Sequence, residues 1–543
     1  MKELWEYTVS LHSKDIWNDS TKILPYLNEW LKSQRWSGLS SIHKFQLVKL
    51  DEYLLYNSKS SKILGLFIKL YSTQEQKFVY TYHIPIEITR MPIKSKNFVI
   101  KLQCMDENLF IQPGEANRQF FELILEYLVK EGEIQSLNSN KICFTWFLKE
   151  FKNIKIKSTE LLGDGGTTNT LFKVKWSDNS KSVCKIYRIL TINPEVKMLS
   201  TLYSSGFHNV PRPFGYVSIT IEGENLPLML FSEFVESIGD GGTQFWSNIN
   251  EQMKSWDKTA VIESDPLESY CRNLGEIVSD FHYHSSIIND DLFTPETLSQ
   301  VDIAKWKAHI EDLFNIAYQN CADIVLDENY AQSILDLVEP FLNRYLKMES
   351  WELLDGTMKI KIHQDLHLSQ MLTNSSSDGI KFVIIDFEGD PLLPPKDKFQ
   401  KDPIFRDLAA ICSAFHYIKY NALEQFSEQK LNIKPQNFRK FYLELALNSA
   451  ENSNLKDSPL HLLINLARKW ETQCQQWFIK SYLHQSSTHE LALNLDFTNL
   501  TTFQSLLYLF RIERLIKELY YESLFRKQNV IIPIIGFLEN QSF

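Results

Sequence analysis

The chain has 543 residues, of which 44% are hydrophobic and 13% aromatic, and its formal net charge is −10. This length allows two or three domains, and this apolar content allows a sizeable core, so a globally disordered chain is excluded. The acidic balance argues against a nucleic-acid-binding protein, which would usually present a basic face.

Seven cysteines are scattered along the sequence without a Cys-x-x-Cys pair. The odd number and the spacing fit neither a disulfide framework nor a zinc site, so reduced thiols are expected. The first residues lack the basic and then apolar pattern of a signal peptide. No apolar run reaches the roughly 18 residues of a membrane span. These features predict a cytoplasmic protein that does not associate with membranes.

The first 135 residues are expected to form an N-terminal module without obvious chemistry. Residues 1–36 are predicted to be mostly helical, because apolar residues from Ile23 to Leu31 fall near helical spacing. Residues 44–112 contain several β-rich runs, and a helix is predicted over 117–131. A structural role is the preferred interpretation of this module.

A glycine-rich segment, 161–170, lies between two strand-like runs in the next part of the chain. Glycines allow backbone N–H groups to approach phosphate oxygens closely, so we expect a phosphate-binding loop. Its candidate residues are Gly165, Gly166, Thr168 and Asn169. A hairpin tip with no ligand would have the same composition.

Lys185 follows in an apolar strand-like run, 182–187. This is the expected place for a lysine that binds the phosphates of ATP. The alternative is a surface lysine at a strand edge. Its position after the glycine-rich segment favours the phosphate-binding role.

The most informative segment is 363–390. Asp365 precedes Gln370 by five positions, and Asp386 follows an apolar run. Phosphoryl transfer needs one carboxylate that accepts the proton of the attacking hydroxyl, and a second carboxylate with an amide that holds the metal ion. We therefore predict Asp365 as the base, with Gln370 and Asp386 as Mg²⁺ ligands. His363 is expected to support this loop, and His367 to lie near the acceptor.

Two short apolar runs, 370–372 and 381–385, flank the turn-forming residues 374–379. They predict a β-hairpin that returns Gln370 to the side of Asp386. The alternative is a surface loop followed by an unrelated hairpin, but the order of all these groups favours the functional interpretation.

Helices are expected over 245–350 and 403–527. Near the end of the second region, one helical face carries Arg514, Glu518, Tyr521 and Glu522, at positions i, i+4, i+7 and i+8. The purely structural interpretation is a solvated helix face with an ion pair. The functional one is a polar wall that binds the hydroxyls of a sugar.

These motifs resemble the maltokinases and, more broadly, the aminoglycoside-phosphotransferase-like kinases that include bacterial glucosamine kinases. Residues 363–370 match the family sequence His-Gly-Asp-Leu-His-Leu-Gly-Gln, with Gln364 and Ser369 in place of the glycines. Residues 385–389 read Ile-Asp-Phe-Glu-Gly, as in the family. The C-terminal helix is also similar, although Lys517 replaces a tyrosine.

The resemblance implies an α+β, bilobal, protein-kinase-like fold with an N-terminal α/β cap. The cap would comprise 1–135, the small lobe 136–236 and the large lobe 237–543. ATP and Mg²⁺ would be the cofactors and a small-molecule sugar the acceptor, with Glu388 among the sugar-binding residues. Maltose, converted to maltose 1-phosphate, is the leading acceptor, and glucosamine, converted to glucosamine 6-phosphate, is the alternative. Whether an enzyme that interconverts trehalose and maltose is a partner stays open.

The resemblance also places Glu233 to Val235 at the adenine-binding hinge. Kinases usually pair the phosphate-binding lysine with a helix glutamate. The aligned position here holds Lys197, and the nearest acid, Glu195, lies two positions away, roughly 200° round a helix. Glu195 is therefore a candidate partner of Lys185.

Two further alternatives remain. Lys197 suggests a catalytically weak pseudokinase that binds sugar or nucleotide, although Asp365, Gln370 and Asp386 argue against it. An antibiotic phosphotransferase would require a strongly acidic acceptor cleft.

Overall fold

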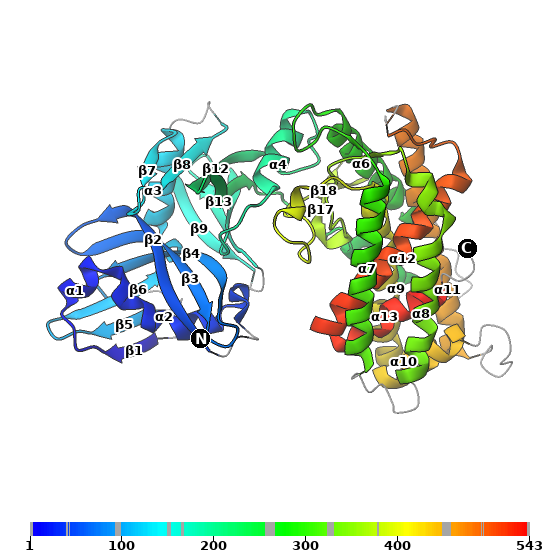
Figure 1. Ribbon diagram of the computed structural model, residues 1–543, viewed down its shortest axis with the longest axis horizontal. Coiled ribbons are helices and arrows are strands. Elements are labelled where there is room, and N and C mark those ends of the chain that lie inside the picture. The colour runs from blue at the N-terminus through cyan, green and yellow to red at the C-terminus, as the bar shows by residue number, and fades with distance from the viewer. Residues whose placement is uncertain are drawn as a thin grey trace. The chain divides into compact units, whose positions relative to one another are not determined.

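The computed structural model contains both helices and sheets (Figure 1). It describes residues 4–39, 42, 44–92, 99–148, 154–163, 168–255, 266–322, 331–376, 379–447, 458–489, 491 and 493–539. Contacts between Cα atoms divide the chain into two units. Residues 1–200 and 211–234 form the first unit, and residues 201–210 and 235–543 form the second.

The first unit begins with a six-stranded sheet of order β1-β5-β6-β4-β3-β2. Its strands are β1 (Leu4–Thr8), β2 (Phe45–Asn57), β3 (Ser61–Ser72), β4 (Lys77–Thr89), β5 (Val99–Gln103) and β6 (Asn108–Pro113). Two helices, α1 (Ser13–Asn18) and α2 (Leu24–Ser33), precede β2. The prediction of a mostly helical start is therefore wrong for Leu4–Thr8, because this segment pairs in parallel with β5.

A seven-stranded antiparallel sheet completes the first unit, in the order β7-β8-β12-β13-β11-β10-β9. Its strands are β7 (Glu133–Gln135), β8 (Lys141–Trp146), β9 (Ile156–Leu162), β10 (Thr170–Trp176), β11 (Lys181–Ile186), β12 (Pro213–Ile221) and β13 (Glu224–Glu233). The predicted helix at 117–131 is confirmed as α3 (Arg118–Val129). Its residues Phe120 and Phe121 join one core with side chains of both sheets, such as Phe67 and Phe172. Apolar burial therefore holds the two sheets and α3 together.

The second unit is mainly helical, as predicted. Its helices are α5 (Thr243–Lys254), α6 (Leu267–Ile287), α7 (Gln300–Ala322), α8 (Ala331–Lys347), α9 (Phe405–Leu431), α10 (Pro435–Leu447), α11 (Pro459–Thr488), α12 (Leu500–Phe525) and α13 (Ile531–Glu539). Helix α4 (Glu195–Ser204) spans the boundary between the units. Two short strands, β15 (Glu296–Thr297) and β16 (Met358–Lys359), form a separate pair. No helix in the described ranges is long and apolar enough to cross a membrane.

The predicted hairpin is confirmed as β17 (Met371–Ser376) and β18 (Gly379–Ile384). β14 (Gly239–Asp240) pairs with β17, so the residues that follow the first unit join this small sheet. The pairing of Met371 with Ile384 places the start of one strand beside the end of the other. The three-part division into cap, small lobe and large lobe stays a prediction.

Close packing of α6 against α11 depends on Gly275. A Cβ atom added there would lie 2.5 Å from the backbone oxygen of Phe478 and 2.8 Å from the Cβ of Ser481. Ordinary helix propensity favours alanine over glycine by about 1 kcal/mol. The contact distances are so short that α11 would have to move to admit the methyl group.

We therefore expect Gly275→Ala to lower the free energy of unfolding by about 1–3 kcal/mol, because overpacking outweighs propensity. Chemical denaturation of the full chain measures this change. Arg272→Ala, on the exposed face of the same helix, is the control and should change stability by about 0.5 kcal/mol or less. A stabilised Gly275→Ala variant would contradict the packing argument.

Candidate active site

The predicted catalytic loop is fixed to the start of α9 by one buried carboxylate. Asp407 accepts hydrogen bonds from the backbone N–H of His363 (2.9 Å) and of Gln364 (3.1 Å). His282 Nε2 lies 3.4 Å from the same carboxylate, and its Nδ1 lies 2.9 Å from the hydroxyl of Tyr482. A buried carboxylate with this many donors holds the loop backbone in place.

Gln364 occupies the position where the family sequence has glycine, and its backbone φ is +72°. A non-glycine residue in this left-handed region is strained by about 1–3 kcal/mol. The side chain compensates in part, because its Nε2 donates to Asp402 Oδ2 at 2.9 Å. The loop therefore keeps its left-handed turn without the glycine.

Asp365 lies between two basic side chains. Its Oδ2 is 3.6 Å from His367 Nε2, and its Oδ1 is 3.5 Å from Arg514 Nη1. Burial acts to raise the pKa of the Asp365 carboxyl, but His367, Arg514 and His363 outweigh it and lower the pKa below the ordinary value. Asp365 is therefore ionised at neutral pH and can accept a hydrogen bond from a hydroxyl group.

The hairpin brings the predicted metal-binding groups together. The N–H of Ile385 donates to the backbone oxygen of Gln370 at 3.0 Å, so Gln370 lies beside the segment that leads into Asp386. Carboxylate oxygens of Asp386 and Glu388 lie within 4.8 Å of each other. Two carboxylates and an amide are hard oxygen donors of the kind that Mg²⁺ prefers, so these residues fit a magnesium ion. Glu388, predicted as a sugar ligand, lies with this group.

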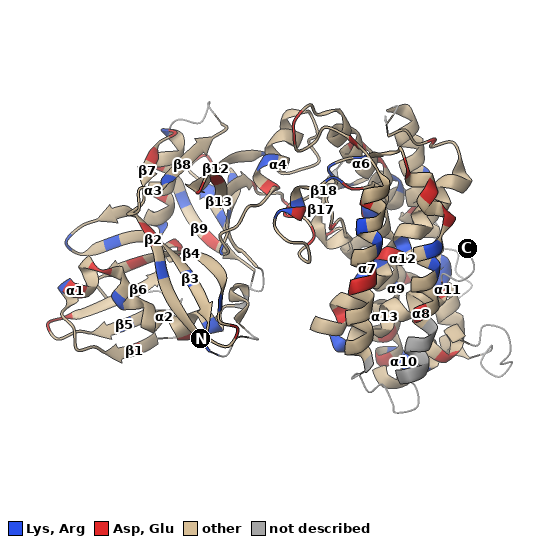
Figure 2. Ribbon diagram, viewed as in Figure 1, with Lys and Arg blue, Asp and Glu red and all other residues tan. Residues whose placement is uncertain are grey.

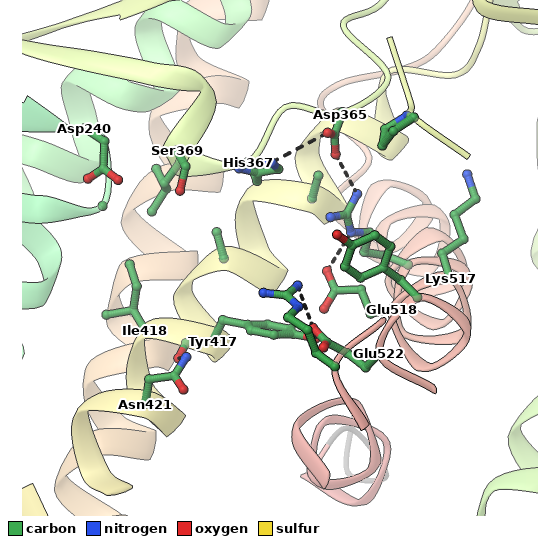
Figure 3. Close-up of a pocket in the computed structure, with 18 of the residues that line it drawn as sticks. Asp240, Asp365, His367, Ser369, Tyr417, Ile418, Asn421, Lys517, Glu518 and Glu522 are labelled. Atoms are coloured by element: carbon green, nitrogen blue, oxygen red, sulfur yellow. Dashed lines mark hydrogen bonds and ion pairs between the residues drawn. The ribbon is translucent and has the colours of Figure 1, made fainter. Parts of the chain in front are cut away.

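A pocket of about 560 Å³ opens beside Asp365 (Figure 3). It lies entirely within the second unit and is lined by α5, the catalytic loop, α9, α12 and residues 390–392. Five of the six predicted sugar-binding residues line it, namely His367, Arg514, Glu518, Tyr521 and Glu522, and so does the predicted base Asp365. The predicted polar face of α12 is therefore a pocket wall rather than a solvated surface.

Two glutamates on α12, Glu518 and Glu522, line this pocket. Glu518 Oε1 accepts from Arg514 Nε (2.7 Å) and Ser413 Oγ (2.9 Å). Glu522 Oε1 accepts from Tyr417 Oη (3.1 Å) and lies 2.8 Å from Arg526 Nη2. Among the described residues, neither Glu518 Oε2 nor Glu522 Oε2 has a hydrogen-bond partner, although both atoms are buried. A buried carboxylate oxygen without a donor is costly, so these side chains add to the acidic character of the pocket wall at some cost in stability.

The pocket wall is anchored from behind by α9. Arg406 Nε donates to Glu513 Oε1 at 2.7 Å, which ties α9 to α12. Burial acts to raise the pKa of Glu513, but Arg406 and Lys517 lower it to about 2. Lys517 Nζ lies 3.5 Å from Glu513 Oε1 and 3.7 Å from Asp390 Oδ2. Lys517 thus belongs to an acidic network rather than standing as an isolated positive charge.

The first unit contains the predicted lysine–glutamate pair. Lys185 Nζ lies 2.7 Å from Glu195 Oε2, and the same oxygen accepts from Tyr187 Oη at 2.6 Å. Asn193 Oδ1 accepts from the N–H of Glu195 at 2.8 Å and so caps the helix start. Because Glu195 stands at the first residue of α4, it reaches the strand, while Lys197 is exposed.

The remaining nucleotide-site residues are described in part. Gly165 and Gly166 lie outside the described residues. Thr168 is exposed and Asn169 buried at the start of β10. Glu233 ends β13, where its carboxylate accepts from the N–H of Arg212 at 3.2 Å, and Val235 is half-buried beyond it. Their roles in nucleotide binding stay predictions.

Sequence reasoning missed several residues of the site. The contacts of Asp407 with the loop have no signal in the sequence. Asp240, Trp246, Tyr417 and Asp390 line the pocket from segments that lie far from α12 in the sequence. Only Asp390 could have been found from the sequence, because it ends the acidic segment that begins at Asp386. The others come together only when α5 and α9 pack.

No protein-family model matches the chain. A glucosamine kinase from Streptacidiphilus jiangxiensis is 22% identical over 228 residues, which are 42% of this chain and 47% of that protein. The chain therefore aligns with about half the length of this curated relative.

Two solved structures cover nearly the whole chain. A glucosamine kinase in complex with glucosamine, ADP and inorganic phosphate has a TM-score of 0.57 at 13% identity, with 93% of this chain and 96% of that chain covered. A second crystal form of glucosamine kinase also has a TM-score of 0.57, at 14% identity, with coverage of 93% and 95%. The chain has the fold of glucosamine kinases. The predicted bilobal kinase-like fold class is confirmed.

We expect Asp407→Ala to lower the free energy of unfolding by roughly 2–6 kcal/mol, because two buried N–H groups lose their acceptor. Amide hydrogen exchange at His363 and Gln364 should accelerate together with this loss. The matched control is Asp312→Ala on the exposed side of α7, which should change neither quantity. Unchanged exchange at both amides would show that Asp407 does not hold the loop.

Proposed function

We propose that this protein is an ATP-dependent sugar kinase whose preferred acceptor carries a protonated amine. The observation that carries the proposal is the acidic lining of the pocket that contains Asp365, to which Glu518 and Glu522 contribute. An ammonium group would be attracted by this acidic lining. Asp365 would then receive the hydroxyl that is to be phosphorylated.

In the proposed reaction Asp365 orients the acceptor hydroxyl and accepts its proton. The hydroxyl oxygen forms a bond to the γ-phosphorus of ATP, and the bond from that phosphorus to the bridging oxygen of ADP breaks. Lys185, positioned by Glu195, would bind the phosphates. Gln370, Asp386 and Glu388 would hold Mg²⁺, which neutralises phosphate charge when bound. Positioning and charge carry most of the rate in such reactions.

Charge distinguishes an amino sugar from maltose. Five acidic side chains line the pocket, namely Asp240, Asp365, Asp390, Glu518 and Glu522, against three basic ones, Arg514, Lys517 and Arg526. The excess of two negative charges favours a cationic acceptor over a neutral disaccharide. Glucosamine is therefore preferred to maltose, the acceptor that the family resemblance put first.

The main argument for the pseudokinase alternative does not hold. It rested on Lys197 at the position of the helix glutamate, but Glu195 makes the ion pair with Lys185 instead. With Asp365, Gln370 and Asp386 also present, an active enzyme is the better-supported proposal. The use of ATP fits the cytoplasmic location expected from the sequence.

The proposal is tested by ADP release from Mg²⁺-ATP with glucosamine, glucose, maltose and an aminoglycoside. We expect release with glucosamine at a kcat/KM well above that with glucose or maltose. Asp365→Asn should retain ATP binding and lower turnover by several orders of magnitude, because the proton acceptor is lost. Near-wild-type turnover of this variant would exclude Asp365 as the base. Release with maltose alone would reinstate the maltokinase assignment.

Glu518→Gln should remove one negative charge from the pocket without changing its shape. We expect kcat/KM for glucosamine to fall about tenfold to a hundredfold, the value of a hydrogen bond to a charged group, while glucose changes only a few-fold. Glu428→Gln, an exposed position on α9, is the control. Equal losses with both sugars would mean that Glu518 has a structural role only.

A further inference from the structure

One wall of the pocket is formed by an irregular segment, 389–402, which joins the proposed magnesium ligands to α9. Apart from a single 3₁₀ turn, η7 (Asp397–Phe399), and a bridge between Ile360 and Asp402, it has no regular secondary structure. Its residues 390–392 line the pocket. An irregular segment of this length is uncommon in a compact unit and usually serves a binding site. The contacts that hold residues 390–392 therefore bear on acceptor binding.

The end of the segment next to α9 is firmly anchored. Ile360 and Asp402 exchange two backbone hydrogen bonds, of 3.1 Å and 2.8 Å. The buried Lys361 donates to the backbone oxygen of Lys398 at 2.6 Å. Arg406 also binds the carboxylate of Asp402. This end is therefore fixed both to the start of the predicted catalytic loop and to α9.

The end of the segment at the pocket makes weaker contacts. Asp390 accepts from the N–H of Leu392 through Oδ1 at 2.9 Å, and from the N–H of Leu393 through its backbone oxygen at 3.1 Å. These two bonds shape the turn but do not tie it to another element. Lys517 Nζ lies 3.7 Å from Asp390 Oδ2, which is longer than a hydrogen bond. A contact between this end and the anchored end would therefore help to fix the pocket wall.

Gln364 lies between the two ends. Its buried side chain donates from Nε2 to Asp402 Oδ2 at 2.9 Å, and Nε2 lies 3.4 Å from the backbone oxygen of Gln400. Its Oε1 packs against Gly389, where an added Cβ atom would lie only 2.6 Å from it. The same Cβ atom would lie 3.4 Å from Lys398 Cβ, so the segment folds back on itself here. One amide group thus joins the anchored end to the residue that begins the pocket wall.

The local conformation of Gln364 supports a function for its side chain. Glycine, which the family sequence has at this position, would adopt the φ of +72° freely. The Oε1 atom of Gln364 is buried and has no hydrogen-bond partner among the described residues. A strained backbone and an unsatisfied oxygen both lower stability. Positions that break local rules in this way tend to be functional.

We propose that Gln364 is a positioning residue for acceptor binding, which holds residues 390–392 beside Asp365. The inference rests on the proposed kinase function and concerns the same pocket. Without the amide, the wall conformation that binds the acceptor would be populated less. The apparent affinity falls with that population, whereas the bound complex is unchanged once it has formed. The KM for the acceptor should therefore rise with little change in kcat.

The first test uses Gln364→Glu, which keeps the shape and the backbone strain but replaces the Nε2 donor with an acceptor that faces Asp402. We expect KM for glucosamine to rise about tenfold, as it does when the competent population falls to about a tenth, while kcat and KM for Mg²⁺-ATP change less than about threefold. Gln429→Glu, exposed on α9 and outside the pocket, is the matched control. An unchanged KM for glucosamine, or equal rises in both KM values, would overturn the positioning role.

Gln364→Gly separates the side chain from the backbone strain, because glycine adopts the left-handed turn freely. We expect the same rise in KM for glucosamine, while the relief of strain keeps the denaturation midpoint close to that of the wild type. A lower midpoint with an unchanged KM would show that Gln364 has a structural role only, and would overturn the proposal.

Amide hydrogen exchange of the free protein gives a readout that does not depend on turnover. The amides of Leu392 and Leu393 should exchange faster in both Gln364 variants and at the wild-type rate in Gln429→Glu. Unchanged exchange at both amides in the Gln364 variants would overturn the proposal. Absence of ADP release from the wild-type protein with every acceptor would overturn the kinase proposal, and the exchange rates would then decide by themselves whether Gln364 holds the segment.

Discussion

The pocket beside Asp365 depends on the contacts made by two charged side chains in the first turn of α9. Asp407 holds the backbone of the catalytic loop, and its neighbour Arg406 binds Glu513 on α12. Loop and pocket wall are thereby fixed to the same helical turn. Buried ion pairs often add little net stability compared with apolar packing, but they tolerate only one geometry. Here that geometry keeps Asp365 and the acidic face of α12 on the same pocket.

Backbone strain is concentrated beside this anchor. Gln364 and Asp386 both have positive φ, although neither is glycine. Such residues persist only where surrounding contacts impose them. The bonds of Gln364 to Asp402 and Asp407 supply those contacts on one side. The hairpin that runs from Met371 to Ile384 supplies a rigid approach to Asp386 on the other. The strained backbone positions, and the contacts that hold them, thus lie at or next to residues proposed to take part in phosphoryl transfer.

The lysine–glutamate ion pair forms although its acidic residue lies two positions before the aligned position. Lys197 occupies the aligned position, but Glu195, at the first residue of α4, reaches Lys185. Asn193 caps this helix and places Glu195 at its start. An acidic side chain in the first turn is also favoured by the helix dipole. Local capping chemistry therefore decides which acidic residue partners the lysine.

The sequence by itself determined the β-rich and helical regions, the hairpin that leads to Asp386, and the polar face of α12, because each depends on local periodicity, turn residues or a short motif. It misplaced the start of the chain, where Leu4–Thr8 is a strand only because β5 lies beside it. It also could not decide whether Glu195, two positions from the aligned site, reaches Lys185. The tertiary structure alone decided the extent and charge of the pocket. Trp246, Tyr417 and Glu522 are far apart in sequence, and only the packing of α5, α9 and α12 brings their side chains to one cavity.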